Sequence, residues 1–240
     1  MAVVPYKEKE DGKKVQVEEM FDSISGKYDF LNSFLSVGID KLWRKKALSY
    51  LKDEKLNTIL DMATGTGELA IASLNLNPNK IIGVDLSEGM LEVGRKKIKA
   101  LQLESKIELL KGDSEKILFP DAHFDAATVA FGVRNFENLE QGLSELCRVL
   151  KPGCKLVVLE FSQPTKFPVK QVYNFYFKNI LPFVGKIISK DSSAYTYLPE
   201  SVGAFPFGKA FTDILLKTGF TKAEAHPLSF GIASIYLATK

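Results

Sequence analysis

The sequence has few of the residues that mark metal, redox or nucleic-acid chemistry. Its 240 residues include two cysteines, two histidines and one tryptophan. Cys147 and Cys154 have neither the spacing of a zinc site nor that of a CxxC pair, so we expect reduced thiols and no metal. The formal net charge is only +3, and we expect no nucleic-acid partner because no concentrated basic stripe is present.

Long apolar runs are also missing. No stretch approaches the roughly 20 residues that cross a bilayer, and the polar first 14 residues have no signal-peptide core. We therefore expect a cytoplasmic protein whose residues 1–14 are frayed. The small Lys and Arg excess is compatible with transient contact with an anionic membrane surface.

What the sequence does contain is an alternation of helix and strand patterns. Apolar residues recur at helical spacing over residues 15–52. From residue 57 onward, buried strands are predicted in NTILDMA, KIIGVD, KIELLKGD, FDAATVAFG and KLVVLEFS. Helices are predicted over 67–76, 87–101 (with Ser87 as N-cap) and 139–150, and a turn at 151–153. This succession predicts an α/β fold with a mostly parallel sheet covered on both faces.

The last third of the chain departs from this rhythm. Residues 164–211 hold 11 aromatic residues, and we interpret them as short helices that form a lid. A helix over 207–218 and two strands, TKAEAHPL and IASIYLAT, follow. The short turn between the strands predicts a hairpin, so that a seven-stranded Rossmann-like sheet ends in an antiparallel strand. The expected division is a helical cap (1–56), a cofactor-binding core (57–163), a lid (164–218) and the hairpin (219–240), all in one domain.

The loop after the first predicted strand, Asp61–Gly67, is the first candidate binding site. Its glycines let the backbone turn tightly and approach a ligand. Gly65 and Gly67 also satisfy a dinucleotide fingerprint, so they do not select a cofactor. Asp61 does discriminate, because a pyrophosphate needs no anion there, whereas the ammonium and sulfonium of S-adenosylmethionine are matched by a carboxylate.

Two further acids end the next two predicted strands. Asp85 is placed to accept hydrogen bonds from both ribose hydroxyls, as either cofactor would require, and Asp113 stands where such methyltransferases read the adenine edge. With Lys151-Pro152-Gly153, these ordered acids are similar to class I S-adenosylmethionine-dependent methyltransferases over residues 57–162. The predicted cofactor-binding residues are Asp61, Thr64, Gly65, Thr66, Gly67, Asp85, Leu86, Asp113 and Ser114.

A narrower resemblance extends from about residue 18 to the end. The segments that carry it are YDFLN (28–32) with Leu35, Ser36 and Trp43, AFGVRN (130–135), RVLKPG (148–153), LEFS (159–162), the tyrosines of the lid, and Gly231-Ile232. Together they resemble the menaquinone and ubiquinone biosynthesis C-methyltransferases of the UbiE/MenG type. Four positions depart from the family pattern. Leu31 and Cys154 are mild changes, Ala130 removes a hydroxyl, and Asp40 rules out a role for a histidine there.

The resemblance implies methylation of a ring carbon of a polyprenylated hydroquinone. A ring carbon becomes more nucleophilic when a neighbouring hydroxyl loses its proton, so a base or a cation that stabilises the phenolate assists the reaction. Arg134 is the leading candidate for that cation, or for orienting a water that takes the proton. Asn135, Tyr28 and Asp29 are the other predicted catalytic residues, and a structural role stays open for each of the four.

Several alternatives remain at this point. A small-molecule O-methyltransferase would have the same cofactor half, and an NAD oxidoreductase is disfavoured by Asp61. A nucleic-acid N-methyltransferase is disfavoured because Ala130-Phe131-Gly132 stands where such enzymes carry a proline box. Demethylmenaquinol is the favoured substrate, a ubiquinone precursor stays open, and so does a homodimer.

Overall fold

The structure, a computed structural model, describes residues 3–28, 38–176, 179 and 193–240. Seven strands in these ranges form one sheet in the order β3-β2-β1-β4-β5-β7-β6. Their bounds are β1 (Thr58–Met62), β2 (Lys80–Asp85), β3 (Ile107–Lys111), β4 (Phe124–Ala130), β5 (Leu150–Phe161), β6 (Lys222–Leu228) and β7 (Ala233–Thr239). Strands β1 to β5 pair in parallel, whereas β7 runs antiparallel to both β5 and β6. The predicted sheet with an antiparallel last strand is confirmed.

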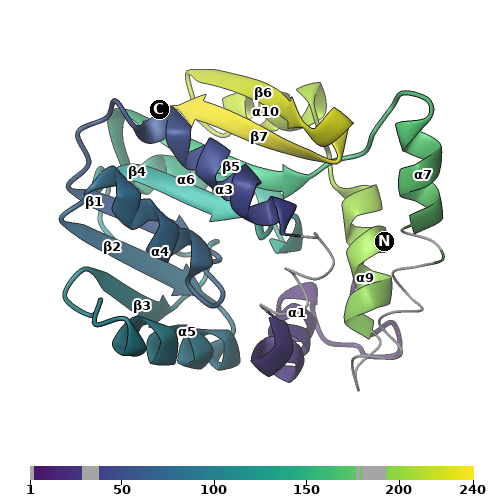
Figure 1. The fold of residues 1–240 in the computed structure, drawn as a ribbon, viewed down its shortest axis with the longest axis horizontal. Helices are drawn as coiled ribbons and strands as arrows, with labels where there is room; N and C mark the ends of the chain where they lie inside the picture. The colour runs from purple at the N-terminus through teal and green to yellow at the C-terminus, as the bar shows by residue number, and fades with distance from the viewer. Residues whose placement is uncertain (1–2, 29–37, 177–178, 180–192) are drawn as a thin grey trace.

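Helices cover both faces of the sheet (Figure 1). Helices α3 (Ile39–Leu48) and α4 (Glu68–Ser73) lie on one face, and α6 (Leu139–Val149) and α10 (Lys209–Lys217) on the other. Neighbouring residues of β1 serve different faces, because side chains alternate along a strand. Ile59 belongs to the core cluster that includes Trp43 of α3, and Leu60 to the cluster that includes Leu143 of α6.

Short polar side chains start two of the connecting helices. Ser87 caps α5 (Glu88–Ala100) by accepting a hydrogen bond from the amide of Met90, as predicted. Asn138 caps α6 in the same way through the amide of Gln141. Both helices therefore begin where the sequence indicates.

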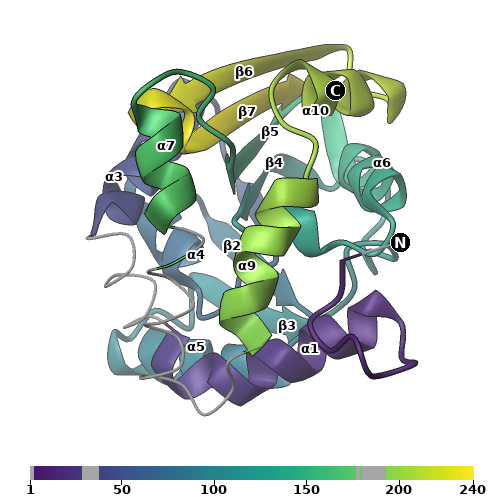
Figure 2. The same cartoon turned by 90° about the vertical axis from the view of Figure 1, so that its right-hand side faces the viewer.

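Three further helices gather beyond the carboxyl ends of the strands (Figure 2): α1 (Lys13–Ile24), α7 (Val169–Phe175) and α9 (Ser193–Ala204). The 3-10 turn η4 (Val133–Asn135), which follows β4, lies against α1 and α9. In parallel α/β sheets, this edge is where ligands bind.

Two local expectations are wrong. The described part of residues 1–14 is not frayed, because the amide of Tyr6 donates to the buried Gln16 side chain and Lys7 pairs with Glu200 of α9 at 2.6 Å. The segment 151–153 is not a turn before β5 but an irregularity inside it. Leu150 already pairs with Phe124, and the amide of Gly153 donates to the carbonyl of Lys240.

Candidate active site

The loop between β1 and α4 is built around Asp61. This carboxylate is 1% exposed and accepts hydrogen bonds from the hydroxyls of Thr64 at 2.6 Å and Thr128 at 2.7 Å. Burial raises the pKa of Asp61 to about 6, against the opposing effect of these hydroxyls. Gly67 then takes a φ of 80°, a left-handed conformation that glycine adopts without strain, and α4 begins.

Asp85 ties this loop to the end of β2. One carboxylate oxygen accepts the amide of Gly65 at 2.7 Å, and the other accepts the amide of Ser87 at 2.9 Å. Burial raises the pKa of Asp85 to about 6 as well. The two acids therefore hold the loop from both sides, and each lines a pocket at the strand ends.

Unusual backbone angles occur at the same edge. Ala63 and Phe131, which follow β1 and β4, have φ values of 54° and 58°, a region that side chains other than glycine rarely adopt. Gly132 lies against Ala63, and a Cβ added at Gly132 would come within 2.4 Å of the Ala63 Cβ. Strained residues of this kind cluster at functional sites.

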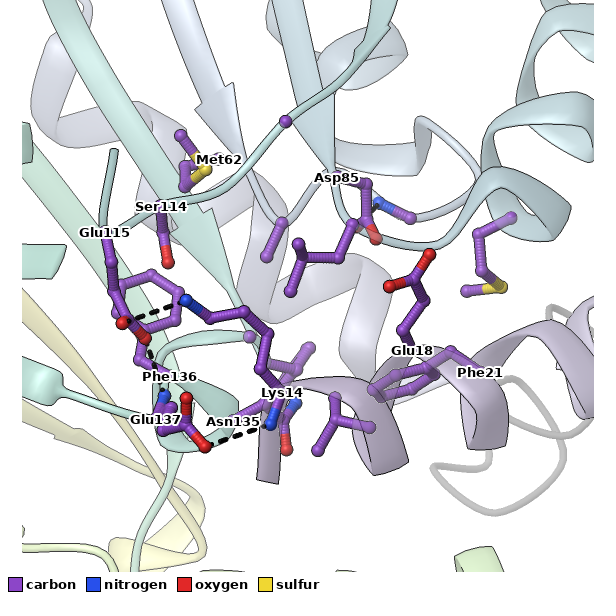
Figure 3. Close-up of a pocket in the computed structure, with 18 of the residues that line it drawn as sticks. Lys14, Glu18, Phe21, Met62, Asp85, Ser114, Glu115, Asn135, Phe136 and Glu137 are labelled. Atoms are coloured by element: carbon purple, nitrogen blue, oxygen red, sulfur yellow. Dashed lines mark hydrogen bonds and ion pairs between the residues drawn. The ribbon is translucent and has the colours of Figure 1, made fainter. Parts of the chain in front are cut away.

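A pocket lies beneath α1, and we call it the α1 pocket (Figure 3). Lys14, Glu18 and Phe21 of α1 face Asp85, Ser114 and Asn135 across it. Lys14 Nζ pairs with Asp113 at 2.7 Å and with Glu115 at 3.1 Å. At the other end of the helix, Asp22 accepts hydrogen bonds from the Ser87 hydroxyl and the Gly89 amide, so polar contacts fix α1 over the pocket at both ends.

Lys13 connects α1 to the turn after β4. Its ammonium donates to the carbonyls of Arg134 and Phe136, both at 2.9 Å. Burial, assisted by the charge of Arg134, lowers the pKa of Lys13 to about 8. Lys13 thus joins helix α1, which covers the α1 pocket, to the turn that carries Asn135.

A second pocket, the α3 pocket, adjoins the first. Lys41, Arg44 and the buried Asp40 contribute from α3, and Arg44 pairs with Asp40 within the helix. Several residues line both pockets: Tyr28, Ala63, Gly65, Ala130 and Phe131. The two pockets therefore form adjacent compartments along the ends of β1 and β4.

Arg134 is held by an acid rather than turned into either of these pockets. Its guanidinium, whose side chain is 7% exposed, pairs at 2.8 Å with the fully buried Glu160 of β5 and also donates to the carbonyl of Phe131. Burial raises the pKa of Glu160, against the effect of the arginine. Within the described part of the chain, the Nε of Arg134 is buried and has no hydrogen-bond partner.

The lid reaches this cluster through tyrosines. Tyr197 of α9 donates a hydrogen bond at 3.1 Å to the side-chain oxygen of Asn135. Burial raises the pKa of Tyr197 to about 12, and it also raises that of Tyr173 on α7. Arg134 and Glu160 act electrostatically on both phenols, so the two lid helices meet the ends of β4 and β5 at one buried polar cluster.

The structure brings most of the predicted site residues together. Those that line one of the two pockets are Asp61, Thr64, Gly65, Thr66, Asp85, Leu86, Ser114, Tyr28 and Asn135. Gly67, Asp113 and Arg134 lie beside the pockets without lining them. Asp29 lies outside the described residues, so its predicted role is unaffected.

Lys13, Lys14 and Glu160 were missed as site residues. The two lysines sit in a polar segment with no motif, and nothing local indicates that they reach residues 99 to 123 positions away. Glu160 could have been found from the sequence, because an acid near the end of a predicted buried strand needs a cationic partner.

Solved structures with the same architecture include methyltransferases. A S-adenosylmethionine-dependent methyltransferase from Thermotoga maritima, titled a possible histamine N-methyltransferase, superposes with a TM-score of 0.63, at 20% identity over 92% of this chain and 99% of that one. A phosphoethanolamine N-methyltransferase from Haemonchus contortus gives 0.60, at 15% identity over 82% of this chain and 52% of that one. The strand order is that of the class I S-adenosylmethionine-dependent methyltransferase fold.

Sequence comparison identifies the family. The sequence model of the ubiE/COQ5 methyltransferase family matches residues 7–240, and the chain belongs to this family. A demethylmenaquinone methyltransferase from Bacteroides fragilis is 49% identical over 96% of this chain and 95% of its own. One from Porphyromonas gingivalis is 43% identical, covering 99% and 98%. A ubiquinone/menaquinone biosynthesis C-methyltransferase from Geotalea daltonii is also 43% identical, covering 98% and 100%.

Proposed function

We propose that this protein transfers the methyl group of S-adenosylmethionine to a ring carbon of demethylmenaquinol and so forms menaquinol. The observation that carries the proposal is the pair of acids, Asp61 and Asp85, beside two adjoining pockets in a chain of the ubiE/COQ5 family. Relatives named for demethylmenaquinone methylation match nearly the whole chain, which supports this substrate.

The residues present fit S-adenosylmethionine, which supplies a methyl group already activated by its sulfonium. Asp61 in the α3 pocket suits the ammonium of the methionine part, because a cation beside this buried carboxylate offsets its desolvation. Asp85 in the α1 pocket suits the ribose hydroxyls, and Leu86 and Ser114 suit the adenine. Thr64, Gly65, Thr66 and Gly67 shape the loop between these groups.

Asp113 is proposed to hydrogen-bond the adenine edge only after its ion pair with Lys14 breaks. In the structure, one of its carboxylate oxygens pairs with Lys14 and the other accepts the amide of Glu115. We therefore expect Asp113→Ala to weaken cofactor binding more than Lys14→Ala does. Equal losses would assign Asp113 to anchoring α1 instead.

The quinol is proposed to meet the cluster at the ends of β4 and β5. The Asn135 oxygen accepts the Tyr197 hydroxyl, so the Asn135 amide nitrogen is left to donate to a substrate hydroxyl. Arg134 supplies positive charge that stabilises the phenolate, and its Nε, which is buried without a hydrogen-bond partner among the described residues, can donate to it. Tyr28, which lines both pockets, and Asp29 are proposed to close the site from the N-terminal side.

Each chain segment outside the cofactor-binding core has a role in this proposal. Residues 1–56 cover the cofactor, residues 164–218 cover the quinol, and residues 219–240 complete the sheet. Among the helices that the structure describes, none combines the length and apolar content needed to cross a membrane. We propose a cytoplasmic location, with contact to the bilayer that holds the prenyl tail.

The direct test is incubation of the purified protein with methyl-labelled S-adenosylmethionine and a reduced or oxidised demethylmenaquinone. Label is expected in menaquinone, and only when the substrate is reduced. The labelled methyl group is expected on a ring carbon, in a carbon–carbon bond that hydrolysis does not break. Label on oxygen would favour an O-methyltransferase of the same fold. Binding of NAD in place of S-adenosylmethionine would overturn the cofactor assignment.

A further inference from the structure

Large apolar side chains are exposed on three neighbouring segments near the lid. Phe167 is 80% exposed, Val172 66% and Phe175 62%, all in or just before α7. Phe230, in the 3-10 turn η6 (Ser229–Gly231), is 84% exposed, and Leu42 of α3 is 66% exposed. We call these five residues the α3–α7 face.

The three segments are continuous in space. The Trp43 indole of α3 donates to the Ser229 hydroxyl at 3.0 Å, which joins α3 to η6. A Cβ built on Gly231 lies 3.5 Å from the Cα of Pro164, so η6 also packs against the segment that connects β5 to α7. Figures 1 and 2 agree, since α3, the β6–β7 connection and α7 lie along the same side of the molecule.

Phe230 is held outward by the backbone. Its φ of 60° is left-handed, a conformation that costs a bulky residue roughly 1–2 kcal/mol. The fold thus tolerates strain at the same residue whose ring is almost fully in water. The strained backbone and the exposed ring both cost free energy, which indicates that Phe230 has a role other than packing the core.

The exposed charged side chains on α3 and on residues 163–176 are all lysines. Exposed Lys45 and Lys46 lie on α3, and exposed Lys166 and Lys170 lie just before α7 and in its first turn. The single acid of α3, Asp40, is buried and paired with Arg44, and residues 163–176 contain no acid. Aromatic and aliphatic side chains framed by lysines are the composition of surfaces that bind the interface of an anionic bilayer.

We propose that the α3–α7 face docks onto an anionic lipid bilayer, with Phe167 and Phe230 inserted among the acyl chains and the lysines at the headgroups. This proposal rests on the proposed function, which places the prenyl tail of the substrate in a membrane. Docking through a face next to α7 brings the lid to the surface from which the quinol enters.

The test is flotation of the purified protein with vesicles of phosphatidylglycerol and phosphatidylcholine, compared with phosphatidylcholine alone. The wild type is expected to float only with the anionic vesicles. The double variant Phe167→Ser/Phe230→Ser is expected to bind at least about a hundredfold more weakly, because it removes two phenylalanine rings from the acyl chains. Leu118→Ser is the control. Leu118 is also highly exposed (79%), but its neighbours Ile117 and Phe119 contact α6, which lies on the opposite face of the sheet from α3.

A charge test uses the same vesicles. Lys45→Glu/Lys46→Glu is expected to weaken flotation at least about twentyfold, whereas Lys96→Glu/Lys99→Glu on α5 leaves it unchanged. Equal flotation of test and control variants would overturn the proposal. A concentration-dependent dimer that the phenylalanine variant abolishes would also overturn it, by assigning the face to a second copy.

Activity separates this proposal from the proposed function. The phenylalanine variant is expected to methylate a short-tailed quinol in detergent at the wild-type rate, and a long-tailed quinol in vesicles at least about tenfold more slowly. If no quinol is methylated at all, the proposed function fails, while the flotation result still decides the docking face.

Discussion

The Tyr197 hydroxyl on helix α9 donates to Asn135 in the turn after β4, so α9 fixes the orientation of an amide that lines the α1 pocket. We expect Tyr197→Phe to reduce kcat about three- to tenfold, the effect of one hydrogen bond, with S-adenosylmethionine affinity unchanged. Steady-state kinetics and calorimetry measure the two quantities. Tyr50→Phe, at a ring stacked on His226, is the control and should change neither. Equal losses in turnover and cofactor affinity would contradict the positioning role of Tyr197.

The buried pair Arg134–Glu160 allows structural and catalytic roles to be separated. Arg134→Ala leaves an uncompensated carboxylate in the core and is expected to destabilise the protein by about 3–5 kcal/mol. Arg134→Ala/Glu160→Gln removes that charge and should recover most of the stability, while turnover stays low. Thermal unfolding and labelled-methyl assays report the two effects. Recovery of turnover together with stability would leave Arg134 with a structural role alone.

The pH dependence follows from Asp61 and Asp85. Burial raises the pKa of each carboxyl from an ordinary 3.8 to about 6, so the folded protein takes up protons more readily than the unfolded chain. The contribution of these groups to stability therefore falls as pH rises from about 4 to 6, whereas cofactor binding needs both ionised. We expect the thermal shift caused by S-adenosylmethionine to shrink steadily from pH 7 to pH 5. A constant shift across that range would argue against ionised carboxylates as the cofactor ligands.

Gly132 offers a steric prediction. A Cβ there would come within 2.4 Å of the Ala63 Cβ, and both residues line the α1 pocket. Gly132→Ala is expected to cost about 1–3 kcal/mol through overpacking and to weaken cofactor binding. Gly203→Ala in α9, where nothing lies within 4 Å of the added Cβ, should instead stabilise by about 0.5–1 kcal/mol. Urea unfolding of the two variants distinguishes these outcomes, and a neutral Gly132→Ala would contradict the steric argument.

Much of the fold was predictable because its signals are local. The strands and the cap at Ser87 follow from short apolar runs and from one hydroxyl before a helix. The acids Asp61 and Asp85 could be assigned to one edge because parallel strands end together. The irregularity at 151–153 could not be predicted, since it depends on Gly153 pairing with Lys240 at the far end of the chain.

The candidate site was less accessible from sequence, because its remaining parts depend on distant partners. Arg134 was singled out from its motif, but its pairing with Glu160 requires β4 and β5 to be side by side. Lys14 and Asp113 are 99 residues apart, and no pattern in either segment indicates that they meet. Polar contacts between helices and loops have no periodicity that a sequence can display.

Helix α1 is held over the α1 pocket by the buried Val17 and Met20 and by charged side chains: Lys13 on backbone carbonyls, Lys14 on two acids, and Glu18 on Lys111. Partly exposed ion pairs weaken as dissolved salt screens them over about 8–10 Å. Ionic strength therefore acts on the cover of the pocket and leaves the buried Arg134–Glu160 pair intact. With the cofactor in this pocket, as proposed, we expect spent cofactor to leave faster as the salt concentration of the surrounding solution rises.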